Sequence, residues 1–165
     1  MDTVWRYITF PKGTKSPEDT LTVLRFFNCH ASEFAVDIIR KYGSLYHSTS
    51  EELKLVIASP AGLGFTEHAI RRDVYAQAKE NGLFTCPAMT GPFLRLLYLD
   101  QPDGEFLEIA MEPIFDWSGN PRVFDLIHHK DCSPQLGTEA VEYLNSPESK
   151  GPRTIDPEKK LVFRI

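Results

Sequence analysis

Two glutamates spaced four residues apart, with an arginine upstream, are the residues of this sequence best suited to chemistry. Glu108 and Glu112 lie in a β-rich run, and the two-residue period of a strand places both side chains on one face. With Arg95 on a neighbouring strand, they could act in general acid–base catalysis or bind an anionic group through the guanidinium. No catalytic residue is assigned. The candidate binding residues are Arg95, Tyr98, Gln101, Glu108 and Glu112. A simpler interpretation is that these charges form cross-strand ion pairs on a solvated face, each worth less than about 1 kcal/mol.

Four potential metal ligands lie together further along the chain. They are His128, His129, Asp131 and Cys132, which carry the nitrogen, oxygen and sulfur donors that zinc prefers. Adjacent residues of a strand point to opposite faces, so the two histidines could bind one ion only if the strand has already ended. A tetrahedral site would also need a ligand from elsewhere, such as His30, His47 or His68. We therefore predict no metal site, and these four residues are the candidates should one exist.

Two further motifs have structural interpretations. Cys86 precedes a proline, and nothing around it is typical of a thiol with a lowered pKa, so we expect a small buried side chain. The glycines of residues 60–65 could bind a phosphate through their backbone amides. Phosphate-binding loops, however, require either a third glycine or a lysine followed by serine or threonine, and this segment has neither. A tight connection between a strand and a helix explains these glycines, and no cofactor is expected.

The candidate residues would be positioned by a β-hairpin. The runs Phe93–Tyr98 and Glu105–Ile114 are β-rich, and the turn-forming residues 100–104 join them. A strand over Arg122–His128 would extend the hairpin to a three-stranded meander. Further strands are predicted at Val4–Phe10, Leu53–Ala58 and Leu161–Ile165.

Three helices are predicted from their capping residues and apolar periodicity. One begins at Ser16, which is followed by Pro17 and two acids, and the next begins at Ser32. The third begins at Thr66, pairs Glu67 with Arg71, and ends at Asn81–Gly82. The segment Cys132–Pro157 is expected to be mobile, with at most one short helix around Glu139–Leu144. The predicted fold class is α+β, a single domain over residues 1–165 in which an antiparallel meander of three to five strands packs on about three helices.

The middle of the chain resembles a group of small uncharacterised bacterial proteins. The resemblance rests on Gly62-Leu63-Gly64-Phe65, Asp73-Val74-Tyr75-Ala76, Cys86-Pro87, Gly91-Pro92 before Leu94-Arg95-Leu96-Leu97-Tyr98, and Asp100-Gln101-Pro102-Asp103-Gly104-Glu105 before Ile109-Ala110-Met111-Glu112-Pro113-Ile114. It covers roughly residues 53–126. It indicates kinship and implies no substrate or reaction.

Composition narrows the classes of partner. The net charge is −5 with 25% charged residues, so double-stranded nucleic acid is not expected, because such ligands require a clustered basic surface. There is no apolar stretch near the length that crosses a bilayer and no secretory signal pattern, and the three separated cysteines suit a reducing compartment. We expect a cytoplasmic protein that does not bind membranes.

The leading hypothesis is a non-enzymatic protein-binding or regulatory module whose partner is another protein. The alternative is a small hydrolase or transferase acting on an anionic substrate at the Arg/Glu site of the hairpin.

Overall fold

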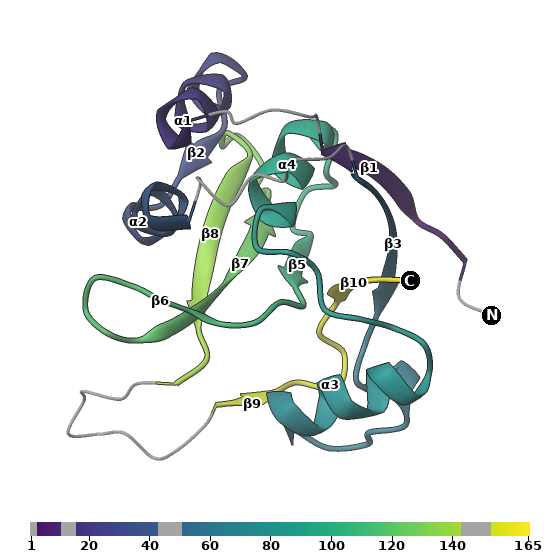
Figure 1. Ribbon diagram of the computed structural model, residues 1–165. Coiled ribbons are helices and arrows are strands. Elements are labelled where there is room, and N and C mark those ends of the chain that lie inside the picture. The colour runs from purple at the N-terminus through teal and green to yellow at the C-terminus, as the bar shows by residue number, and fades with distance from the viewer. Residues whose placement is uncertain (1–2, 11–15, 43–50, 143–152) are drawn as a thin grey trace.

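A mixed sheet of eight strands forms the centre of the computed structural model, which describes residues 3–10, 16–42, 51–142 and 153–165. Seven strands follow the order β1-β3-β10-β5-β7-β8-β2, and β6 pairs with β7 (Figure 1). Their bounds are β1 Arg6–Phe10, β2 His30–Ala31, β3 Glu51–Ala58, β5 Phe106–Ile109, β6 Ile114–Phe115, β7 Pro121–Ile127, β8 Gln135–Ala140 and β10 Leu161–Arg164.

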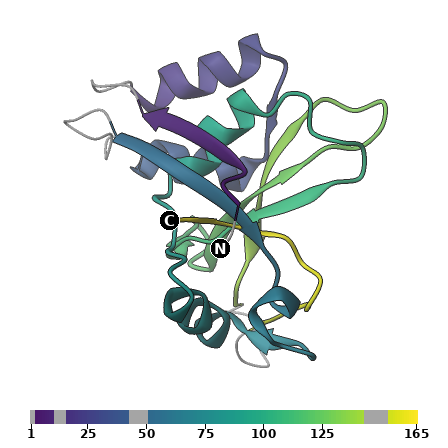
Figure 2. The same cartoon turned by 90° about the vertical axis from the view of Figure 1, so that its right-hand side faces the viewer.

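Helices cover both faces of this sheet. α1 (Pro17–Phe26), α2 (Glu33–Tyr42) and α4 (Thr90–Leu97) lie on one side, and α3 (Arg71–Glu80) lies on the other (Figure 2). A second, two-stranded sheet of β4 (Ala69–Ile70) and β9 (Thr154–Ile155) adjoins α3, and a short 3-10 helix, η1 (Ala61–Leu63), follows β3. Within the described residues, no helix has both the length and the apolar character needed to cross a bilayer.

The first two predicted helices are confirmed, because their starts are encoded locally. The hydroxyl of Ser16 accepts a hydrogen bond from the backbone of Asp19, whose carboxylate in turn accepts one from the Ser16 N–H. These two bonds form a capping box ahead of α1. Ser32 likewise accepts a hydrogen bond from the backbone of Ala35 at the start of α2, at 3.2 Å. The third helix is also present, but Ile70 rather than Thr66 precedes it, and Arg71 does not pair with Glu67.

The predicted meander on three helices is wrong. The sheet is mixed, because β10 pairs antiparallel with β3 and parallel with β5, and β2 pairs parallel with β8. The protein has four α-helices among its described residues, rather than about three. Parallel pairs join segments that are distant in sequence, so no local turn signal reveals them. Strands β5, β7 and β8 do form antiparallel neighbours, but they are not the three strands that the sequence predicted.

The predicted hairpin is also wrong, because residues 90–97 form helix α4. The apolar run that follows Pro92 satisfies a strand and a buried helix equally, and proline is well tolerated in the first helical turn. The second predicted strand is divided into β5 and β6, with Pro113 just before β6. Around Glu139, where a short helix was expected, the chain instead forms β8 as far as Ala140, and residues 143–152 lie outside the described part.

Two apolar clusters stabilise the fold on the two faces of the sheet. The larger cluster joins α1, α2 and α4 to the sheet and includes Leu24, Ile38, Leu94 and Leu107. The smaller cluster lies beneath α3 and includes Val74, Ala78 and Phe163. Because side chains alternate along a strand, Leu107 and its neighbour Glu108 belong to opposite faces. This alternation separates the residues of the predicted site.

Gly91 permits the close approach of α4 to the sheet, and its replacement by alanine should be destabilising. A Cβ atom at position 91 would lie 2.7 Å from Cβ of Phe124, which is fixed to β7. The helix would have to move away from the buried ring, and we expect a loss of about 2 kcal/mol in the free energy of unfolding. Urea denaturation measures this loss. Gly62→Ala is the matched control, since its Cβ would meet only Ser59 Oγ at 3.5 Å. Equal effects of the two changes would refute the packing argument.

Candidate functional site

The structure brings together three of the predicted site residues, Arg95, Tyr98 and Gln101, but as a buried structural cluster. The Arg95 side chain is 0% exposed. One of its terminal nitrogens donates to Oε1 of Gln101 at 2.5 Å and to the carbonyl of Gln135 at 3.5 Å, and the other donates to the carbonyl of Tyr98. Gln101 in turn donates to the carbonyls of Glu105 and Leu126, at 3.0 and 3.1 Å. These contacts tie the end of α4 to β7 and β8.

Glu108 lies on the opposite face of the sheet and does not meet Arg95. Its carboxylate is 0% exposed, pairs with Arg71 of α3, and lies 2.6 Å from Nζ of Lys159. The structure therefore corrects the expectation that Arg95 and Glu108 would flank one substrate. The physical reason is that α4 replaces the predicted strand and packs on the Leu107 side. Glu112, which lies beyond the end of β5, is exposed and contributes to a cavity described below.

A network of charged side chains surrounds Glu108 on the α3 face. Lys159 bridges Glu108 and Glu139, with Nζ 2.6 Å from an oxygen of each carboxylate. Arg153 lies 3.5 Å from the other oxygen of Glu139. On the far side, Arg71 pairs with Glu108 and donates to the Tyr75 hydroxyl at 3.1 Å. Although burial alone would lower the pKa of Arg71, the charge of Glu108 raises it overall.

Asp125 is the third carboxyl group of this network. It is the direct neighbour of Glu108 across the β5–β7 pair and of Gly137 across the β7–β8 pair. The side chain is 4% exposed, and Oδ1 has no hydrogen-bond partner among the described residues. Burial, followed by the charges of Glu108 and Glu139, raises the pKa of Asp125 to about 7, although Lys159 opposes the shift. Asp125 therefore titrates near neutral pH.

A cavity of about 460 Å³ opens beside the network, between the start of α3 and the ends of β8 and β9. Arg71 belongs to both the charged network and the cavity, since it pairs with Glu108 and also lines the cavity. The other charged lining residues are Arg72, Arg153, Glu112 and Glu142, and the remainder are Ile70, Tyr75, Pro113 and Val141. The cavity therefore combines cations with an apolar wall.

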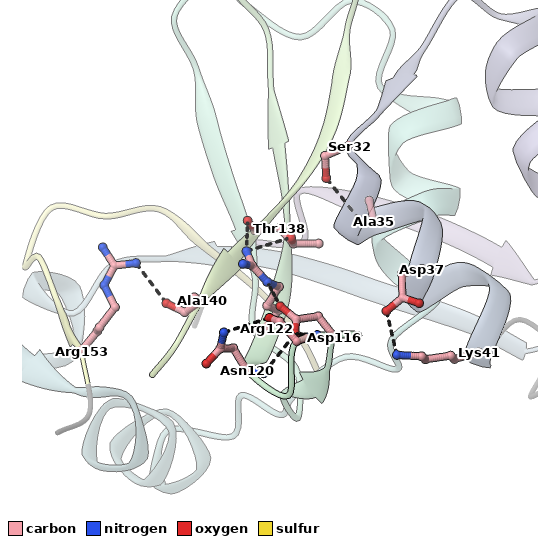
Figure 3. A network of polar contacts seen from close by, with 11 residues as sticks. Ser32, Ala35, Asp37, Lys41, Asp116, Asn120, Arg122, Thr138, Ala140 and Arg153 are labelled. Carbon is pink, nitrogen blue, oxygen red and sulfur yellow. Dashed lines mark hydrogen bonds and ion pairs between the residues drawn. The ribbon is translucent and has the colours of Figure 1, made fainter. Parts of the chain in front are cut away.

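Two further features make the cavity favourable for negative charge. The side chain of Ile70 cannot cap the α3 N-terminus, so the first amides of this helix carry partial positive charge close to Arg71 and Arg72. Arg153 reaches across from the segment before β9 and donates to the carbonyl of Ala140 at 3.1 Å (Figure 3). Its backbone N–H donates to the carbonyl of Val141 at 3.0 Å, which fixes the base of this side chain at the cavity wall.

The four metal candidates do not converge. Residues 128–132 lie beyond the end of β7, Asp131 has a positive φ of 64°, and Cys132 is exposed. Nδ1 of His128 contacts the carbonyl of Gln101 at 2.5 Å. No group of three or more histidine, cysteine, aspartate or glutamate side chains within the described segments is arranged to hold a metal. Cys86 is buried, as predicted, and burial raises the pKa of its thiol to about 12.

A second polar cluster holds the β6–β7 connection in place. Asp116 accepts a hydrogen bond from Asn120 and pairs with Arg122 (Figure 3). It also accepts a hydrogen bond from the hydroxyl of Ser118. Although burial alone would raise the pKa of Asp116, these hydrogen bonds lower it to about 2. The guanidinium of Arg122 lies 3.5 Å from the ring centroid of Phe34, whose ring stacks on Trp117. These contacts therefore hold the backbone of the β6–β7 connection, which carries exposed aromatic side chains.

Sequence reasoning missed Arg71, Asp125, Glu139, Lys159 and Arg153. One signal was available for Asp125, namely an acid in the centre of the apolar run Val123-Phe124-Asp125-Leu126-Ile127, since buried acids are rare unless paired or functional. The others come from separate elements, and only the fold brings them together. Comparisons of this chain with protein-family models, with curated proteins and with solved structures found no match.

Proposed function

We propose that this protein is a non-enzymatic regulatory module that binds a small anionic molecule in the cavity between α3, β8 and β9. The observation that carries this proposal is the convergence of Arg71, Arg72 and Arg153 on one cavity of about 460 Å³. That volume lies within the range of sites for small molecules. Guanidinium groups are suited to carboxylates and phosphates, because they donate hydrogen bonds in a planar fork.

The rest of the lining indicates an anion with an apolar portion. Ile70, Pro113 and Val141 supply apolar surface beside the three arginines. Each arginine also contacts one carboxylate, namely Glu108, Asp73 or Glu139, and a guanidinium has further N–H donors for other acceptors. The uncapped start of α3 adds partial positive charge. A carboxylate or phosphate on a ring or short hydrocarbon would place its charge near the arginines and its apolar part against these side chains.

Tyr75 supplies a phenol hydroxyl beside Arg71 at the cavity. Burial is the largest of the effects that raise the pKa of its hydroxyl to about 12, and the hydroxyl is held by Arg71. A phenol that stays protonated at neutral pH can donate a hydrogen bond to a bound anion. The hydrolase or transferase hypothesis needs Arg95 beside Glu108 or Glu112, whereas Arg95 is buried below α4 and both glutamates lie on the α3 side of the sheet.

Arginine substitutions test the proposed cavity. The protein would be titrated calorimetrically with benzoate, phenyl phosphate and inorganic phosphate. We expect phenyl phosphate or benzoate to bind, and Arg72→Met and Arg153→Met each to weaken binding about tenfold, the effect of one charge-assisted hydrogen bond. Arg25→Met is the matched control, because Arg25 is exposed in the last turn of α1. If none of the three anions binds, or if Arg25→Met weakens binding as much as the cavity variants do, the proposal is wrong.

A second candidate function is binding of another protein through the β6–β7 connection. Phe115 and Trp117 are 53% and 64% exposed, although the network around Asp116 and the Trp117–Phe34 stack hold their backbone. Exposed aromatic side chains on a fixed support are typical binding hot spots. An affinity pull-down from native lysate should retain a partner that the Phe115→Ser/Trp117→Ser variant loses and that Phe26→Ser keeps. Phe26 is the control, because it is 82% exposed at the end of α1. Equal retention by all three proteins would contradict this function.

A further inference from the structure

Three carboxyl groups lie together on three neighbouring strands beneath the cavity. Glu108 comes from β5, Asp125 from β7 and Glu139 from β8. Glu108 and Asp125 are direct cross-strand neighbours, and Glu139 pairs with Val123, two residues before Asp125. Because strand side chains alternate, all three acids point to the α3 face. Carboxylates this close cannot all ionise without compensation.

The available cations compensate two of the three acids. Arg71 and Lys159 pair with Glu108, and Lys159 and Arg153 pair with Glu139. Asp125 makes no ion pair within the described segments, and its Oδ1 is buried without a hydrogen-bond partner. Alanine at Gly137 would place its Cβ in contact with this same oxygen, so Asp125 is also closely enclosed. Asp125 is therefore the acid that holds a proton.

The charge of Asp125 is transmitted to the cavity through two arginines. Arg71 and Arg153 line the cavity while they contact Glu108 and Glu139, the two acids that face Asp125. With Asp125 neutral, the three cations Arg71, Lys159 and Arg153 exceed the two carboxylates by one charge. When Asp125 ionises, this excess disappears. An anion in the cavity therefore meets a more positive surface while Asp125 is protonated.

We propose that the protein binds its anionic ligand together with a proton, which is held on Asp125. This inference rests on the proposed function of the cavity. Linkage makes the effect reciprocal, since a bound anion disfavours the ionised carboxyl and a protonated carboxyl favours the anion. Ligand affinity then falls as the pH rises through the titration of Asp125, and the module responds to both ligand concentration and pH.

The groups that face Asp125 place this response near neutrality. Glu108 from β5 and Glu139 from β8 add negative charge, whereas Lys159 from the segment before β10 adds positive charge. Arg71 and Tyr75 of α3 act one contact further away, through Glu108. Burial and the two acids outweigh the lysine, and the pKa of Asp125 is raised to about 7.

Calorimetry with benzoate at pH 6 to 8.5 tests the coupling, because benzoate stays ionised throughout this range. Repeating each titration in buffers of different ionisation enthalpy gives the number of protons taken up. We expect the wild-type protein to take up a fraction of a proton near pH 7 and its Kd to rise up to about tenfold by pH 8.5. Asp125→Asn should take up no proton and retain the low-pH affinity at every pH, because its amide mimics the neutral acid. Asp103→Asn, in the exposed turn before β5, should behave as wild type.

The outcomes separate the two proposals. Benzoate binding without proton uptake by the wild-type protein would overturn the coupling and leave the cavity as an anion site. Proton uptake that persists unchanged in Asp125→Asn would also overturn it. No binding of benzoate, phenyl phosphate or phosphate at any pH would instead contradict the proposed function, and the coupling with it. If Asp125→Asn does not fold, the absence of proton uptake by the wild-type protein still overturns the coupling.

Discussion

Arg95→Met is expected to lower the free energy of unfolding by about 3 kcal/mol or more. The guanidinium is fully buried and supplies hydrogen bonds to Gln101 and to the carbonyls of Tyr98 and Gln135. Methionine fills similar space but donates nothing, so several buried acceptors lose their partner, each at a cost of about 1–3 kcal/mol.

Urea denaturation of Arg95→Met and of a matched surface variant measures this effect. Arg40→Met removes the same charge from an exposed pair with Glu18, where N and O lie 2.8 Å apart, and should cost less than about 1 kcal/mol. If Arg95→Met unfolds at the same urea concentration as Arg40→Met, the cluster at the end of α4 does not stabilise the fold. A loss of ligand affinity without a loss of stability would instead return Arg95 to the list of binding residues.

Asp125→Asn is expected to change the pH dependence of stability by up to about 4 kcal/mol. Folding raises the pKa of Asp125 from 3.8 to about 7, and each pKa unit corresponds to about 1.4 kcal/mol. Below pH 3.8 the Asp125 carboxyl is protonated in both the folded and the unfolded state. Between the two values only the folded state holds the proton, so the stability of the wild-type protein falls as the pH rises through this window. Above about 7 the penalty is fully present.

Denaturation of the wild type and Asp125→Asn at pH 4, 6 and 8 gives the difference in stability directly. Asparagine carries no ionisable proton. The free energy of unfolding of Asp125→Asn should therefore rise relative to that of the wild type as the pH rises, by up to about 4 kcal/mol. Asp103→Asn serves as the control here too, because its exposed side chain should leave the profile unchanged. A difference between wild type and Asp125→Asn that stays constant with pH would show that Asp125 ionises as easily in the folded state as in the unfolded state.

The parts of the fold that could be predicted are those encoded by neighbouring residues. Ser16 and Ser32 predict the starts of α1 and α2, because a capping hydroxyl binds a backbone N–H only three residues further along the chain. Strand β7 was anticipated by its own apolar run. The parallel pairing of β10 with β5 and of β2 with β8 could not be predicted, since pairing between distant segments depends on the whole chain. The run around Arg95 was misassigned because its apolar pattern suits a strand and a helix equally.

The sequence and the structure give Glu108 different partners. An arginine–glutamate pairing with Glu108 exists, but the arginine is Arg71, and nothing in the sequence distance between positions 71 and 108 indicates their contact. Glu112 does line the cavity, although it shares no strand with Glu108. Hydrophobic alternation correctly separates the faces of one strand, but the cations that an acid meets come from other elements.

The central place of β10 has a consequence for how the chain folds. This strand lies between β3 and β5, and its residues Val162 and Phe163 contribute to the two apolar clusters on either face. A ribosome releases β1, β3, β5, β7 and β8 before β10, so the nascent chain has two separate half-sheets with unpaired edges. Burial of both halves awaits one late strand, which favours slow folding governed by long-range contacts and makes chaperone assistance during synthesis valuable.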